Sequence, residues 1–188
     1  MNGDTLKLIG EIIGAVAIIE GFMIYFAKSK ENILLFKFIS DFLWFVNFIC
    51  TGGWTGAILN LIGMCREAVF SQRGKRKLFS GYIWLWLFLI LSLISPTVSL
   101  LKGGEGLWSI LPALGSAIAV IAFYHNNATY TRIIGLVSQV LWLIYSIGIK
   151  NFSSTVCNIV LIISAVSGII RDIIGNKKAW GETRGQYH

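Results

Sequence analysis

Seven apolar runs, separated by short polar or glycine-containing links, limit how this chain can fold more than any other feature. They cover residues 5–27, 33–51, 54–72, 79–98, 105–125, 130–149 and 152–174. Most of them approach the ~20 residues that an α-helix needs to cross the hydrocarbon core of a bilayer. Hydrocarbon offers no partner to backbone N–H and C=O groups, so each run has to satisfy them within one helix. The pattern predicts an all-α membrane protein with seven transmembrane helices.

The composition agrees with this class and argues against an enzyme. Hydrophobic residues make up 55% of the chain and charged residues 13%, whereas soluble domains carry about 25% charged residues. The three cysteines, Cys50, Cys65 and Cys157, lie inside apolar runs and have neither a disulfide pattern nor zinc spacing. The sequence contains no nucleotide-binding glycine motif, no HExxH and no Ser/His/Asp set at one depth. We therefore expect no catalytic residues, no metal and no cofactor.

The basic residues predict the orientation of the chain. If the N-terminus lies outside, thirteen of the 16 Lys and Arg residues fall on the cytoplasmic side, and only Lys7, Lys102 and Lys150 fall outside. Cytoplasmic loops of membrane proteins are enriched in Lys and Arg. We therefore predict N-terminus out and C-terminus in. The run QRGKRK at 72–77 is interpreted as a topology determinant beside anionic lipid and not as a nucleic-acid site.

An internal repeat appears when the chain is aligned with itself at an offset of 98 residues. Trp44 then falls on Trp142 and Asn60 on Asn158, with no gap. Polar side chains are uncommon and expensive inside membrane helices, so their recurrence at one spacing carries more weight than matches between Leu or Ile.

The repeat predicts a 3+1+3 arrangement of the seven helices. An odd linker helix lets both three-helix units point the same way, a parallel repeat in which transporters hold substrate between the halves. The predicted parts are a first repeat at 1–77, a linker helix at 78–101, a second repeat at 102–174 and a flexible cytoplasmic tail at 175–188.

Polar and aromatic residues gather on one face of the second and sixth runs, at i, i+4 and i+7 spacing. The third and seventh runs bring an asparagine to the same depth. An indole face packs against the C–H face of a sugar or against a planar base, and an amide matches hydroxyl groups. The predicted substrate-binding residues are Trp44, Asn60, Trp142, Asn158, Ser40, Asn47, Ser138, Gln139 and Tyr145. In the alternative interpretation, the asparagines bond one helix to another and the tryptophans only pack.

Charged residues within the runs predict ion pairs. Lys37 and Asp41 are one helical turn apart and can pair. Glu20 and Arg66 are expected at a similar depth, and we predict that they form an inner bridge or gate. Proton coupling through Glu20, Asp41 or Glu11 stays open, because none of these acids recurs in the second copy.

Two residues that weaken a helix occupy matching places in the two copies. Gly14 lies in the first run, and Pro112 interrupts the fifth, at an offset of 98 residues. Both are predicted to mark bends used in gating, although glycines also serve as close-packing positions.

The 3+1+3 plan with a Trp–Asn pair in each copy resembles the SWEET and SemiSWEET sugar carriers of the PQ-loop superfamily. This resemblance implies that Trp44 with Asn60, and Trp142 with Asn158, line a substrate pocket. No Pro-Gln pair occurs in this sequence. Vitamin carriers of the PnuC type share the plan, and they move nucleoside-like compounds.

The segment GGWTGAILNLIGMCREAVF at 52–70 resembles, more closely, the bacterial inner-membrane YgjV family. The matching positions are Gly56, Ala57, Asn60 and Arg66. The resemblance implies a multi-pass protein of the bacterial inner membrane.

Taken together, these features predict a facilitator or secondary carrier for a small polar solute such as a sugar, working by alternating access. A nucleoside-like vitamin carrier and a non-transporting membrane scaffold are the alternatives. The expected partners are the solute and the lipid bilayer, with no nucleic acid, and self-association into a homo-oligomer is kept open.

Overall fold

The computed structural model describes residues 3–26, 30–101, 105–124 and 128–185, and these residues form helices without any β-strand. The elements are α1 (Gly3–Phe26), α2 (Lys30–Thr51), α3 (Trp54–Ser71), η1 (Lys77–Phe79), α4 (Ile83–Leu101), η2 (Gly106–Ser109), α5 (Ile110–Tyr124), α6 (Ala128–Gly148) and α7 (Phe152–Gly185). The predicted all-α class with seven helices is confirmed for the described part of the chain.

Two stretches of the described residues are long and apolar enough to cross a bilayer, as judged by length and composition. They are Leu34–Thr51 in α2 and Gly106–Tyr124, which joins η2 to α5. Shorter apolar helices cover Ile83–Thr97, Ile133–Gly148 and Phe152–Ser167. The prediction of seven membrane spans stays a prediction.

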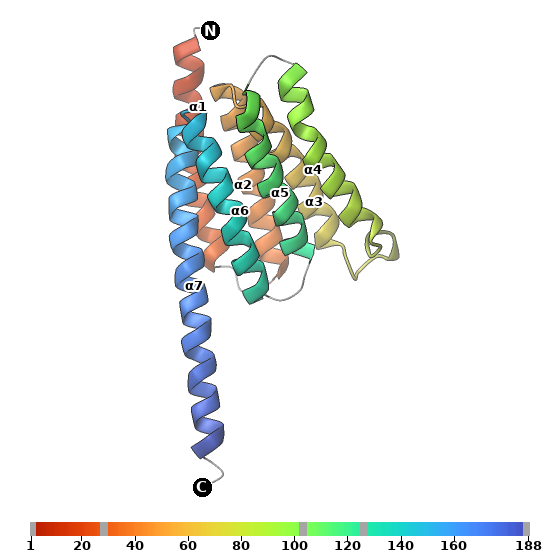
Figure 1. Ribbon diagram of the computed structural model, residues 1–188, viewed down its shortest axis with the longest axis vertical. Helices are drawn as coiled ribbons and strands as arrows, with labels where there is room; N and C mark the ends of the chain where they lie inside the picture. The colour runs from red at the N-terminus through yellow and green to blue at the C-terminus, as the bar shows by residue number, and fades with distance from the viewer. Residues whose placement is uncertain (1–2, 27–29, 102–104, 125–127, 186–188) are drawn as a thin grey trace.

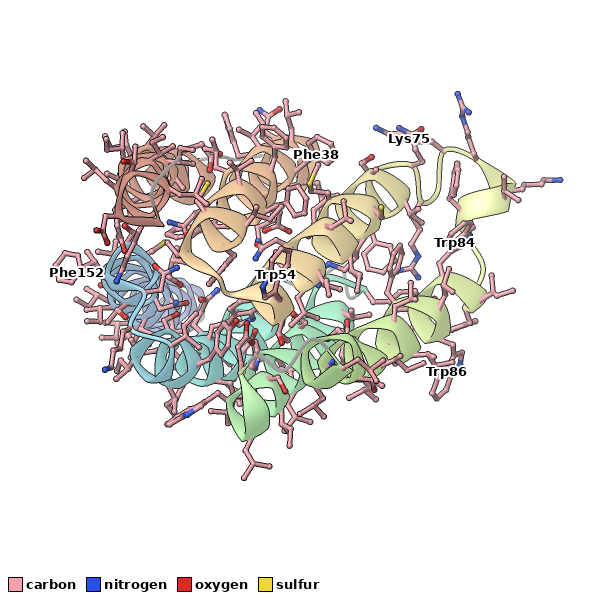
Figure 2. The ribbon with its side chains drawn as sticks, turned by 90° about the horizontal axis from the view of Figure 1, so that it is seen from above. Phe38, Trp54, Lys75, Trp84, Trp86 and Phe152 are labelled. Carbon is pink, nitrogen blue, oxygen red and sulfur yellow. The ribbon has the colours of Figure 1, made fainter. Side chains whose placement is uncertain are left out.

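Consecutive helices alternate in direction, and they form two rows. Figure 1 shows α1, α3, α5 and α7 running one way and α2, α4 and α6 running the other way. Seen from above, α1, α2 and α3 make one row, and α7, α6 and α5 make the facing row, with α4 beyond α3 and α5 (Figure 2). The rows touch at both ends, because α1 packs on α7 and α3 packs on α5.

The two ends of the bundle differ in character. The α2–α3 and α6–α7 connections lie at one end, here called the link end. The segment 72–77 lies at the other, here called the basic end (Figure 1).

The two connections at the link end have the same backbone geometry. Each contains one residue with positive φ, Gly52 at 84° and Lys150 at 56°. In each, the next residue donates its N–H to the carbonyl five residues earlier, at 2.9 and 3.0 Å. Glycine adopts positive φ without a Cβ penalty, whereas lysine adopts it at a cost. The turn therefore recurs at the offset of 98 residues even where its sequence does not favour it.

Proline occupies two different helical contexts. Pro112 is the third residue of α5, which follows the 3₁₀ turn of η2. The first turn of a helix needs no N–H from this position, so Pro112 costs α5 no hydrogen bond, and the predicted bend at Pro112 stays a prediction. Pro96, by contrast, lies inside α4. It cannot donate to the Ser92 carbonyl, and the Ser95 hydroxyl donates to that oxygen instead, at 2.8 Å.

The apolar core has two parts. The first lies between the rows and is centred on Phe48 and Tyr145, both of which are fully buried. The second joins α3, α4 and α5 through Phe70, Phe88 and Tyr124, with Phe70 contacting both other rings edge-on. This second cluster attaches α4 to the side of the bundle, away from the space between the rows.

The last helix is longer than its apolar run. α7 continues to Gly185 and projects beyond the rest of the bundle (Figure 1), whereas the sequence predicts an end at 174 and a flexible tail from 175. Residues 186–188 of that tail, and Lys102, lie outside the described residues.

Candidate functional site

A cavity of about 180 Å³ lies between the two rows of helices. Its walls come from both rows, namely α1, α2 and α3 on one side and α5, α6 and α7 on the other. The volume is below the 300–1,000 Å³ typical of pockets for drug-sized ligands. Seven of the nine predicted substrate-binding residues line it: Trp44, Asn60, Trp142, Asn158, Ser40, Ser138 and Gln139.

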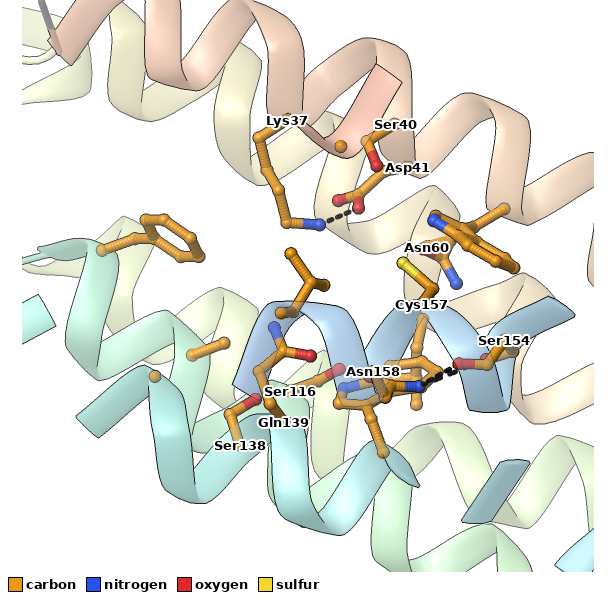
Figure 3. Close-up of a pocket in the computed structure, with 18 of the residues that line it drawn as sticks. Lys37, Ser40, Asp41, Asn60, Ser116, Ser138, Gln139, Ser154, Cys157 and Asn158 are labelled. Carbon is orange, nitrogen blue, oxygen red and sulfur yellow. Dashed lines mark hydrogen bonds and ion pairs between the residues drawn. The ribbon is translucent and has the colours of Figure 1, made fainter. Parts of the chain in front are cut away.

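The two asparagines enter the cavity with the same local geometry. Nδ2 of Asn60 donates to the Gly56 carbonyl at 2.7 Å, and Nδ2 of Asn158 donates to the Ser154 carbonyl at 2.8 Å. These bonds to the residue's own helix fix the direction of each amide. An amide has two donors and a carbonyl acceptor, so its oxygen can still bind a ligand. Figure 3 shows the two amides on different walls of the cavity.

Aromatic rings close the cavity toward the link end. The Phe48 ring lies 6.1 Å from Trp44 and 6.0 Å from Trp142, measured between centroids. A Cβ added at Gly53 or Gly56 would lie within 2.8 Å of the Phe48 ring, so these glycines allow the ring to pack on the start of α3. Trp44 and Trp142 therefore both pack on the Phe48 ring. These three rings are here called the aromatic floor of the cavity.

Tyr145 does not line the cavity and lies on the far side of this floor. Its hydroxyl donates to Oε2 of Glu105 at 3.0 Å and accepts the Gly56 N–H at 3.1 Å. It thus joins α6 and the segment before η2 to the first turn of α3, which belongs to the opposite row.

Asn47 is also absent from the cavity wall. Its Nδ2 donates to the Gly10 carbonyl on α1 at 2.8 Å, and its Oδ1 accepts from Nδ2 of Asn151 at 2.8 Å. Asn47 and Tyr145 are 98 residues apart. They differ in chemistry, but each bonds its own row to the start of the third helix in the other row.

Two carboxylates add to these bonds between the rows at the link end, because each accepts a backbone N–H group at a helix N-terminus. Glu105 accepts the Thr55 N–H at the start of α3, at 3.1 Å. Glu11 accepts the Ser153 N–H at the start of α7, at 3.0 Å. Thr55 and Ser153 are again 98 residues apart. A carboxylate at a helix N-terminus satisfies an otherwise unbonded donor and opposes the positive end of the helix dipole.

Charged side chains line the cavity toward the basic end. Lys37 and Asp41 form the ion pair that their spacing predicts, with 23% of the Lys37 side chain exposed. The predicted pair of Glu20 with Arg66 does not form. Arg66 instead donates two hydrogen bonds to Oε1 of Glu67, at 2.7 and 3.1 Å, and lies 4.0 Å from Asp41.

The Arg66–Glu67 pair was not predictable from residue spacing. Adjacent residues on a helix do not face each other, yet both of these side chains are long enough to turn toward the same buried space. Arg66 also lies over the Phe123 ring of α5, 5.1 Å from its centroid. The roles of Glu67 and Glu105 were therefore missed, since both depend on packing and not on spacing.

Gly14 lies in the uninterrupted interior of α1 and acts as a close-packing position. A Cβ there would collide with the side chain of Ser153 on α7 and would lie 2.8 Å from Nδ2 of Asn47. The glycine therefore brings α1 against both α7 and α2, and the predicted bend at Gly14 stays a prediction.

No group of three or more His, Cys, Asp and Glu side chains suited to a metal ion occurs among the described residues.

Comparison with known proteins gives a family and no closer relative. Residues 8–174 match the model of the Imp-YgjV family, described as bacterial inner membrane protein. The match covers most of the chain, and the chain belongs to that family. Searches of the curated proteins and of the solved structures found no match. The resemblance to sugar carriers therefore depends on the sequence motifs alone.

Proposed function

We propose, starting from membership of an inner-membrane family, that this protein is a carrier that moves a small polar solute across the membrane by alternating access. The observation that carries the proposal is the convergence of Trp44, Asn60, Trp142 and Asn158 on one cavity. The members of each matching pair are 98 residues apart in sequence, and they reach the cavity from opposite rows.

A 3+1+3 parallel repeat accounts for how the rows meet. In such a repeat, α1, α2 and α3 correspond to α5, α6 and α7. The contact of α1 with α7 then corresponds to the contact of α5 with α3, and both contacts are present. The link turns and the asparagine bonds repeat under the same exchange. Such a twofold relation gives a carrier two similar halves that can rock about a site between them.

The orientation proposed is N-terminus out, with the link end outside and the basic end in the cytoplasm. In this orientation, the aromatic rings and the cross-row hydrogen bonds at the link end close the cavity on its outer side, which supports an inward-facing state. The segment 72–77 lies on the cytoplasmic side, as the positive-inside rule requires.

The cavity chemistry suits a solute with several hydroxyl groups. Two amides and the hydroxyls of Ser40, Ser116 and Ser138 offer donors and acceptors around an indole-lined space. A monosaccharide satisfies both demands. A nucleoside-like compound is the second candidate, because an indole face also accepts a planar base.

The proposal is tested by uptake into proteoliposomes of radiolabelled monosaccharides and nucleosides. We expect uptake of at least one of them, and a loss of about five- to thirtyfold in Asn60→Ala and Asn158→Ala, corresponding to about 1–2 kcal/mol for a lost buried hydrogen bond. Gln72→Ala, which removes an amide outside the cavity, is the matched control and should transport normally.

Two outcomes would contradict the proposal. Normal uptake by both asparagine variants would remove these residues from the site. No uptake of any compound, together with a tightly copurifying protein or lipid, would favour a membrane scaffold.

A further inference from the structure

Five charged side chains from three helices lie together between the middle of the bundle and the basic end. They are Glu20 on α1, Lys37 and Asp41 on α2, and Arg66 and Glu67 on α3. The corresponding positions in the second copy are Ile118, Gly135, Gln139, Ser164 and Ala165, none of which is charged. The cluster therefore breaks the twofold relation of the two halves.

Four of the five charges balance one another. Lys37 pairs with Asp41, and Arg66 bonds to Glu67 and lies near Asp41. Two cations thus match two carboxylates.

Glu20 is the fifth group, and neither of its carboxylate oxygens has a hydrogen-bond partner, although both are shielded from solvent. The groups that face it are Lys37, Ser40 and Asp41 of α2 and Cys157 of α7. Among the described residues, no basic nitrogen lies within 4.0 Å of its carboxylate.

We infer that Glu20 is a proton-binding site of this protein and that the carrier couples solute movement to one proton. An unpaired carboxylate is expensive inside a membrane, whereas the neutral acid is not, so Glu20 holds a proton in this state. The coupling rests on the proposed function, but the binding of the proton does not.

Glu20 is placed to exchange its proton with the cavity. Gly21, the next residue, lines the cavity, and so do Ser40 and Asp41, which face Glu20. On release, the O–H bond of Glu20 breaks, the proton passes to cavity water and the carboxylate keeps the electron pair. Lys37, which faces Glu20 from α2, is then a cation available to the new charge. Because the cavity opens to one side at a time, uptake and release occur on opposite sides of the membrane.

Proton binding is tested without any solute, by infrared spectroscopy of the full-length protein in liposomes at neutral pH. We expect the C=O stretch of a protonated carboxyl group in the wild type, and its loss in Glu20→Gln. Glu11→Gln is the matched control from the same helix and should keep the signal, because the Glu11 carboxylate accepts hydrogen bonds from the N–H and the hydroxyl of Ser153. Equal signals in the wild type and Glu20→Gln would overturn the inference.

Glu20→Asp keeps the test decisive if Glu20→Gln does not fold. A shift of the C=O stretch in this variant supports the assignment, and an unchanged stretch overturns it.

Coupling is tested with an imposed proton gradient across proteoliposomes. The wild type should accumulate the transported solute, whereas Glu20→Gln should only exchange it. Accumulation by Glu20→Gln equal to that of the wild type would overturn the coupling. If no solute is transported but the infrared signal depends on Glu20, the proposed function fails and the proton site stands.

Discussion

At the scale of single residues, the charged part of the cavity depends on a missing side chain. Asp41 reaches Arg66 because α3 presents Gly63 at the point of contact. A Cβ on Gly63 would lie 3.1 Å from the Asp41 carboxyl carbon and closer still to its Oδ2. Gly63 thus leaves room for the Asp41 carboxylate to lie against α3, between Lys37 of α2 and Arg66 of α3.

Gly63→Ala is expected to destabilise the protein by up to about 2 kcal/mol. Overpacking a filled interior usually costs about 1–3 kcal/mol, and the ~1 kcal/mol that alanine gains over glycine in a helix offsets part of this cost. Thermal unfolding in detergent measures the difference. Gly135→Ala on α6 is the matched control, because nothing lies within 4 Å of its added Cβ, and it should leave stability unchanged or raise it. A Gly63→Ala protein as stable as the wild type would mean that Asp41 is not held there.

At the scale of elements, the first turns of α3 and α7 are the points at which the rows are fastened. Each receives a carboxylate from the other row, through Glu105 and Glu11, and a polar side chain, through Tyr145 and Asn47. A helix N-terminus is suited to this role because its first N–H groups have no partner within the helix. The closure at the link end is therefore made of bonds that can break without unfolding any helix.

Tyr145→Phe should weaken this closure by about 1–2 kcal/mol, since it leaves the Gly56 N–H unbonded, and should raise the opened fraction about five- to thirtyfold. Cys157 lines the cavity and reports the opening. In a Cys50→Ala/Cys65→Ala background, a membrane-impermeant thiol reagent added outside should modify Cys157 faster in the variant. The control is Tyr82→Phe, which changes an exposed tyrosine directly before α4. It should match the background rate. Equal rates in all three proteins would contradict the closure.

At the scale of the whole molecule, the basic segment 72–77 is expected to determine which end faces the cytoplasm. The link end carries Phe152, and the basic end carries Leu78, with exposed fractions of 74% and 73%. These two positions lie at opposite ends of the bundle and are equally exposed on the surface of the protein.

Single cysteines at these two positions in a thiol-free variant test the orientation. In intact cells, an impermeant maleimide should label Phe152→Cys and not Leu78→Cys. In inside-out vesicles the pattern should reverse, which serves as the internal control. Labelling of Leu78→Cys in intact cells would place the C-terminus outside.

Several features of the fold and site were predictable from the sequence. Apolar runs predicted the helices, because a helix is the local way to satisfy backbone groups in hydrocarbon. The recurrence of Trp and Asn at one offset indicated which side chains belong together. The i, i+4 spacing indicated the Lys37–Asp41 pair, since such neighbours face each other on a helix.

The tertiary structure decided what depends on distance between segments. Asn47 and Tyr145 share a helix face with the cavity residues, yet they fasten the link end, because the aromatic floor separates them from the cavity. Arg66 pairs with Glu67 and not with Glu20, because burial brings adjacent long side chains into one space. Periodicity determined the helices and their polar faces, whereas only packing determined which polar groups are bonded and left the shielded carboxylate of Glu20 without a hydrogen-bond partner.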